Sequence, residues 1–265
     1  MHTVESVYED NRAAMLNKVP QLALAFWIIK ILATTVGETA ADLLSTTLNL
    51  GTVLTSWVMA GLLIVTLVFQ LRSKRYVPPI YWLVVVFISV VGTLISDNLV
   101  DGMGISLVTT TIIFTIALII VFVAWYASEH TLSVHTIVTT KRELFYWAAI
   151  LFTFSLGTSA GDLISERLGQ GYFVAALLFA AGIAVVYAAY KFLHLNAVLT
   201  FWIAYILTRP LGASIGDLLT ATKEEGGLNL GTIPVSAVFL VVIVVLVVHL
   251  TRKENARLAR PVTTT

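Results

Sequence analysis

The sequence has no cysteine among its 265 residues, and only 12% of its residues are charged. Without cysteine the chain can form no disulfide, no thiolate metal site and no cysteine nucleophile, and a site for a soft metal loses its best ligand. Catalytic patterns are also missing, because we find no nucleotide-binding glycine-rich loop, no Ser/His/Asp set and no metalloprotease helix motif. The sequence therefore predicts no enzyme and no bound cofactor. We also expect no cleaved signal peptide.

Apolar residues dominate the composition instead. Hydrophobic residues make up 58% of the chain and the mean hydropathy is +0.92, which is typical of an integral membrane protein. About 20 apolar residues cross a bilayer core of about 30 Å. Such stretches lie near 21–47, 52–71, 79–100, 104–127, 144–166, 171–193, 196–221 and 231–250. The sequence predicts an all-α protein with eight transmembrane helices, a lipid bilayer as partner and no nucleic acid.

One motif occurs four times: an aromatic residue and Trp, then Gly ten residues after the Trp, a small residue four further on, and Asp directly after it. The copies are Trp27/Gly37/Ala41/Asp42, Trp82/Gly92/Ser96/Asp97, Trp147/Gly157/Gly161/Asp162 and Trp202/Gly212/Gly216/Asp217. Each copy begins a two-helix repeat, and the repeats span 21–75, 76–130, 144–195 and 196–251 of one transmembrane domain, 21–251. Copies one and three, and copies two and four, are each 120 residues apart. This spacing indicates a duplicated pair, so 21–127 should resemble 144–250 more than neighbouring repeats resemble each other.

Basic residues in the connections predict the orientation. Twelve lie on the side of the two termini and two, Arg167 and Lys223, lie on the other. The twelve are Arg12, Lys18, Arg72, Lys74, Arg75, Lys141, Arg142, Lys191, Arg252, Lys253, Arg257 and Arg260. We therefore expect a plasma (inner) membrane protein with a cytoplasmic N-terminal segment, 1–20, and a cytoplasmic tail, 252–265. Because each repeat crosses the membrane twice, the repeats share one orientation, and we expect a pseudo-symmetry axis along the membrane normal.

This arrangement resembles a family of bacterial membrane proteins that is described as a repeat of unknown function. Its members carry four tandem units, each with two transmembrane segments and a characteristic tryptophan. The resemblance covers about residues 21–251 and is carried by the four tryptophans with their Gly-x4-Asp sequels. It implies the fold, but it brings no activity that could be transferred to this chain.

The small residues of the motif predict close helix packing. Two small residues four positions apart lie on one face and let transmembrane helices approach each other. The alternative role is a hinge or an unwound turn. The glycines concerned are Gly37, Gly92, Gly157, Gly212, Gly161 and Gly216. For the four tryptophans we favour an aromatic belt at the membrane interface.

The four aspartates are the strongest candidates for a functional site. A carboxylate at the centre of a span costs about 2.5–3.5 kcal/mol, and such residues usually face a bundle interior or a water-filled cavity. Asp42, Asp97, Asp162 and Asp217 each lie fifteen residues after the Trp, or about 22 Å along a helix, which places them toward the external leaflet. We expect them to converge on one cavity that opens externally. The alternative is four solvated helix ends.

Three more charges lie within the spans: Glu38, Lys30 and Arg209. Glu38 and Arg209 differ in height by four residues, about 6 Å, so a cross-helix ion pair is as plausible as a role with substrate. With all groups ionised, five carboxylates and two basic groups leave a charge of −3. Oxygen ligands select hard cations. The five histidines fall outside the spans or at their cytoplasmic ends.

The leading hypothesis is a secondary transporter of a hard cation, plausibly divalent, in which the four aspartates and Glu38 bind the ion or exchange protons. One alternative is a passive channel in which the acidic residues ring an axial pore. Another is a membrane scaffold in which the aspartates are structural.

Overall fold

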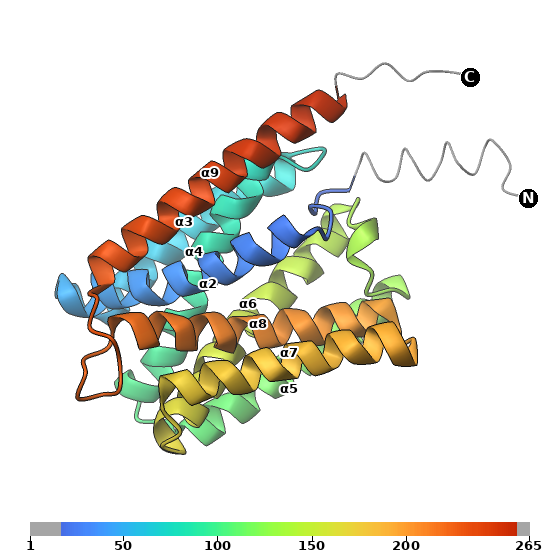
Figure 1. Ribbon diagram of the computed structural model, residues 1–265. Helices are drawn as coiled ribbons and strands as arrows, with labels where there is room; N and C mark the ends of the chain where they lie inside the picture. Colours follow the sequence, from blue (N-terminus) through green and yellow to red (C-terminus); the bar gives the residue numbers. More distant parts are fainter. Residues whose placement is uncertain (1–16, 259–265) are drawn as a thin grey trace, which may run out of the picture.

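The computed structural model describes residues 17–258, except for the side chains of Glu166 and Leu258 (Figure 1). Eight of its helices are long and apolar enough to cross a membrane, as the sequence predicted. They are α2 (Leu24–Asp42), α3 (Thr52–Arg72), α4 (Pro78–Asp97), α5 (Leu107–Glu129), α6 (Thr140–Asp162), α7 (Gly171–Leu193), α8 (Ala197–Thr220) and α9 (Thr232–Leu258). The protein is an all-helical, multi-pass membrane protein.

Residues at the first turns of α3, α4, α6 and α8 explain why these helices begin after the predicted breaks. Pro78 and Pro79 occupy the first turn of α4, where a missing N–H removes no helical hydrogen bond. Thr139 and Asn196 cap α6 and α8, because their side-chain oxygens accept hydrogen bonds from first-turn N–H groups. Gly51 precedes α3 with φ +74°, a left-handed conformation that glycine adopts without steric cost.

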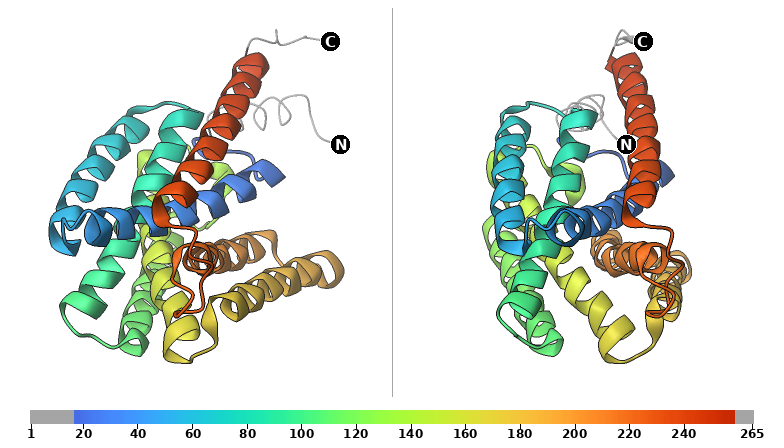
Figure 2. Two further views of the ribbon diagram at one scale, coloured as in Figure 1. Left: turned by 60° about the vertical axis from the view of Figure 1, so that its left-hand side comes forward. Right: turned by 90° about the vertical axis from the view of Figure 1, so that its left-hand side faces the viewer.

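The four motif helices form a closed ring. Helix α2 packs on α4, α4 on α6, α6 on α8, and α8 returns to α2. The four plain helices lie outside this ring, and Figure 2 shows them at its periphery. Each packs on the motif helix of the following repeat: α3 on α4, α5 on α6, α7 on α8, and α9 on α2. The N-terminal end of α2 and the C-terminal end of α9 therefore lie at the same end of the bundle, on the right of Figure 1.

An aromatic layer joins the motif helices at the end where they begin, which we name the tryptophan end. The aromatic residue before each Trp contacts the Trp of the next motif helix, in one cyclic order. The ring centroids are 5.7 Å apart for Phe26 and Trp82, 5.3 Å for Tyr81 and Trp147, 6.2 Å for Tyr146 and Trp202, and 5.8 Å for Phe201 and Trp27. Three of the tryptophans, Trp82, Trp147 and Trp202, are buried. The expectation of an interfacial belt was therefore wrong for these three rings, which fill the protein core, whereas Trp27 is half-buried.

A glycine layer follows, in the same cyclic order. Each first motif glycine lies against the residue three positions before the glycine of the next motif helix. The pairs are Gly37 with Ser89, Gly92 with Phe154, Gly157 with Arg209, and Gly212 with Thr34. A Cβ at any of the four glycines would come closer than 3.0 Å to its neighbour, so these residues are packing positions. Gly161 and Gly216 also lie on this face, against Pro210 and Thr35.

The structure describes parts of the two segments that were predicted to lie outside the domain. Helix α9 continues to Leu258, into the segment expected to be a tail, 252–265. Lys18 belongs to the expected N-terminal segment, 1–20, but it is buried and bonded to Glu143. Residues 1–16 and 259–265 lie outside the described part of the chain.

Candidate cation site

The aspartates lie where the motif helices end, which we name the aspartate end. Asp42, Asp97 and Asp162 are the last α-helical residues of α2, α4 and α6, and Asp217 lies in the last turn of α8. Three of these helices continue as short π-helices, η1 (Leu43–Thr47), η2 (Asn98–Gly102) and η4 (Leu163–Arg167). Such π-helical turns are uncommon and occur frequently at functional sites. The change of helical form therefore falls directly after an aspartate in three repeats.

One cavity of about 430 Å³ brings all four aspartates together. Its described lining contains seven acidic residues and no basic residue: Glu38, Asp42, Asp97, Asp101, Asp162, Asp217 and Glu225. The sequence placed five of these residues at the site. Carboxylates from the four repeats thus line one space at the aspartate end.

Asp101 and Glu225 were not predicted as site residues. Asp101 lies in η2 and Glu225 in the connection between α8 and α9, so both were assigned to breaks between spans. The hydroxyl and the backbone N–H of Thr222 both donate hydrogen bonds to Glu225, at 2.8 and 3.0 Å. These bonds lower the pKa of Glu225, because they favour the ionised carboxylate. The signal was present in the sequence, since Asp101 and Glu225 lie within eight residues of a motif aspartate.

The carboxylates do not form a ready-made chelating cluster. Among the described residues, no three His, Asp or Glu side chains are grouped so that they could hold a metal ion. The cavity volume of 430 Å³ is also much larger than the volume of about 30 Å³ that one water molecule occupies in the liquid. One bare ion would therefore not fill the cavity. A cation in this cavity would contact a few carboxylates directly and keep part of its hydration shell, as Mg²⁺ commonly does.

A family comparison identifies the architecture around this cavity. The model of a family described as "Repeat of Unknown Function (DUF347)" matches residues 25–76, 80–131, 145–195 and 200–256. The chain belongs to the DUF347 repeat family. No curated protein and no solved structure matches the chain significantly.

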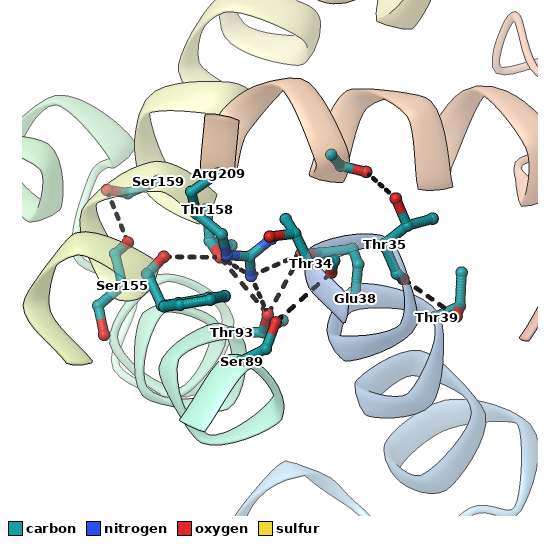
Figure 3. A network of polar contacts seen from close by, with 12 residues as sticks. Thr34, Thr35, Glu38, Thr39, Ser89, Thr93, Ser155, Thr158, Ser159 and Arg209 are labelled. Carbon is teal, nitrogen blue, oxygen red and sulfur yellow. Dashed lines mark hydrogen bonds and ion pairs between the residues drawn. The ribbon is translucent and has the colours of Figure 1, made fainter. Parts of the chain in front are cut away.

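Behind the cavity of this DUF347 protein, Arg209 lies at the centre of the ring (Figure 3). Its guanidinium Nη2 is 2.9 Å from Oε2 of Glu38, and it also donates to the hydroxyls of Thr93 and of Thr158, the latter at 2.7 Å. These three acceptors occupy the same motif position, directly after the glycine, on α2, α4 and α6. In α8 that position is Ala213, which is fully buried and offers no side-chain acceptor. The ion pair that the sequence allowed between Glu38 and Arg209 is therefore formed.

Lys30 lies closer to the tryptophan end and has no carboxylate within ion-pair distance in the described chain. Its ammonium donates to the backbone carbonyl of Tyr205 at 2.9 Å and to the hydroxyl of Thr208. It also lies 3.9 Å from the centroid of the Tyr205 ring, in a cation–π contact. Lys30 was predicted as an intramembrane charge partner; its contacts are polar and aromatic groups of α8 and the ring of Phe154 on α6, whose centroid is 5.4 Å away.

A second buried ion pair lies at the tryptophan end and was not predicted. Lys18 is 2.6 Å from Glu143, and the amide of Gln70 donates to the same carboxylate at 2.8 Å. Lys18 also donates to the carbonyl of Leu71 at 3.0 Å. No sequence pattern predicted this pair, because a Glu in the first turn of a helix after a Thr cap is typical of a solvated residue. These bonds fasten the segment before α2 to α3 and α6.

Proposed function

We propose that this protein is a secondary transporter of a hard cation, such as a divalent metal ion, coupled to protons. The observation that carries the proposal is that four equivalent intramembrane aspartates line one cavity whose described lining has no basic residue. Carboxylates within a span are costly and are found mainly where they bind or conduct something. Four of them at one depth repel each other unless a cation or protons reduce the charge.

The chemistry of the lining favours a hard ion. Carboxylate and hydroxyl oxygens, here with Thr46 and Thr220 beside the aspartates, are the ligands that Mg²⁺, Ca²⁺ and Mn²⁺ prefer. Protons and metal ions compete for the same carboxylates, so metal binding releases protons. This competition provides a direct route to proton-coupled exchange.

The ring behind the cavity supports a gated transporter over an open pore. Arg209 lies among the residues after the motif glycines, and the aromatic layer fills the space between the motif helices at the tryptophan end. A cation channel would need a continuous polar path through both layers. With the termini cytoplasmic, as the basic residues predict, the cavity opens to the outside.

Ion binding and uptake by the full-length protein test the proposal. Purified protein is titrated with Mg²⁺, Ca²⁺ and Mn²⁺ by calorimetry, and proteoliposomes are assayed for uptake with and without a pH gradient. We expect saturable, gradient-dependent uptake, and weaker binding when any of Asp42, Asp97, Asp162 or Asp217 is replaced by Asn. Glu254→Gln, at the tryptophan end, is the control and should behave as wild type.

Two results would argue against this function. Binding and uptake that are unchanged in folded Asn variants would assign the aspartates a structural role and favour a scaffold. Currents through single molecules, without saturation or dependence on a pH gradient, would favour a passive channel.

A further inference from the structure

Glu38 belongs to two arrangements at once. It lines the acidic cavity, and its carboxylate also accepts hydrogen bonds from Arg209 at 2.9 Å and from Thr93 at 3.2 Å. The contact with Arg209 is an ion pair, and the side chains of Arg209 and Glu38 are only 0% and 8% exposed. The cavity is thus joined to the core of the ring through this side chain.

Arg209 is a cation held in an unusual way. The side chain is fully buried, and Nη2 makes all of the bonds to Glu38, Thr93 and Thr158. Its Nε and Nη1 are buried without a hydrogen-bond partner in the described chain. Buried donors normally find partners, and an unsatisfied one requires a specific explanation. The guanidinium is therefore held through one nitrogen, and its other two nitrogens, which carry three N–H groups, have no hydrogen-bond partner among the described residues.

The bond between Arg209 and Glu38 also joins the two duplicated halves of the chain. Arg209 lies on α8, in the second half, whereas Glu38 and Thr93 lie on α2 and α4, in the first. Thr158, on α6, belongs to the same half as Arg209. If Glu38 were neutralised by another cation, the ion pair that joins Arg209 to the first half would be weakened.

From these contacts we infer that Arg209 is a tethered counter-cation, which neutralises Glu38 while the cavity is empty and is displaced from it when a transported cation binds. A cation among the carboxylates offers Glu38 a second positive partner, and the two cations compete for one charge. Displacement weakens the contact between the halves, so occupancy of the cavity is linked to the arrangement of the ring. This inference rests on the proposed function. It adds that Arg209 competes with the transported cation for Glu38, and that removal of Arg209 therefore increases the affinity for the cation.

Removing Arg209 should tighten cation binding, whereas a purely structural residue would weaken it when removed. We expect Arg209→Gln to bind the preferred ion of Mg²⁺, Ca²⁺ and Mn²⁺ about tenfold more tightly than wild type, and to transport it more slowly. In a Glu38→Gln background the same change should have little effect, because the shared carboxylate charge is gone. Lys191→Gln removes an exposed positive charge at the tryptophan end and is the matched control.

Calorimetric titration of the four proteins, wild type, Glu38→Gln, Arg209→Gln and the double variant, decides the matter. If Arg209→Gln fails to fold, Arg209→Met replaces it, because methionine keeps an unbranched apolar stem against Gly157 and removes the charge, and tighter binding is again expected. Unchanged or weaker binding by a folded Arg209 variant would overturn the inference and leave the proposed function intact. Equal tightening with and without Glu38 would also overturn it, because the effect would then be a distant charge effect. A wild-type protein that binds none of the three ions would remove the proposed function and this inference together.

Discussion

Gly157 of α6 lies directly against the aliphatic stem of Arg209 on α8. The same relation, from a motif glycine to the residue three positions before the next motif glycine, holds around the whole ring. The glycine layer therefore fixes both how closely the helices approach and which side chains reach the axis.

Gly92→Ala should destabilise the protein by about 1–3 kcal/mol, the usual cost of overpacking a core. Its new Cβ would lie 2.6 Å from Cβ of Phe154 and 3.2 Å from the backbone nitrogen of Ser155. Gly61→Ala is the matched control, because nothing lies within 4 Å of a Cβ there. Unfolding in detergent, followed by circular dichroism, measures both variants. Equal stability of the two would contradict the packing role.

Glu143→Gln should destabilise the tryptophan end, by about 3–5 kcal/mol if the buried lysine keeps its charge. The variant leaves Lys18 without its carboxylate, and the side chains of this pair are only 7% and 1% exposed. The double variant Lys18→Met/Glu143→Gln should recover part of the loss, because it leaves no unpaired charge. Glu129→Gln, which breaks a partly exposed pair with Arg142, is the control and should change little. A double variant less stable than Glu143→Gln would contradict this explanation.

Orientation can be tested directly, because the chain has no cysteine of its own. Met103 lies beside the aspartate end and is 70% exposed, whereas Lys74 lies in the connection between α3 and α4 at the tryptophan end. We expect a membrane-impermeant maleimide to label Met103→Cys in intact cells and to label Lys74→Cys only after lysis. The reverse pattern would place the cavity opening on the cytoplasmic side.

The pH dependence of the connection after α8 follows from Glu225. Because hydrogen bonds from Thr222 lower its pKa, they stabilise the fold above the ordinary pKa of a glutamate, and this contribution is lost as the pH falls through the lowered value. Thr222→Val removes the hydroxyl bond and should move the pKa of Glu225 up toward its ordinary value. Carboxyl carbon NMR shifts across an acid titration measure the change. An unaltered titration would show that the backbone N–H alone sets the pKa.

The sequence predicted the ring of aspartates because one motif, repeated in register, must place equivalent residues at equivalent depth. It also predicted that Glu38 and Arg209 could pair, since both depart from the repeat at nearby heights. The burial of Trp82 could not be predicted in this way, because an aromatic residue near a helix start suits both a lipid interface and a core, and only the neighbouring helix decides. No sequence pattern predicted the π-helical turn after Asp97, because such a turn depends on which backbone hydrogen bonds form there.

The packing of α9 on α2 has a consequence for how the molecule is made. The hydroxyls of Thr39 and Ser236 are 2.6 Å apart, so α9, which follows the four ring helices in the sequence, completes the surroundings of α2. Since each plain helix packs on the motif helix of the following repeat, a packed helix pair never coincides with one sequence repeat. A chain interrupted before α9 would have seven helices in the bilayer and still leave its first motif helix without its outer partner. Removal of α9 is therefore expected to leave the ring of α2, α4, α6 and α8 closed and to expose the outer face of α2.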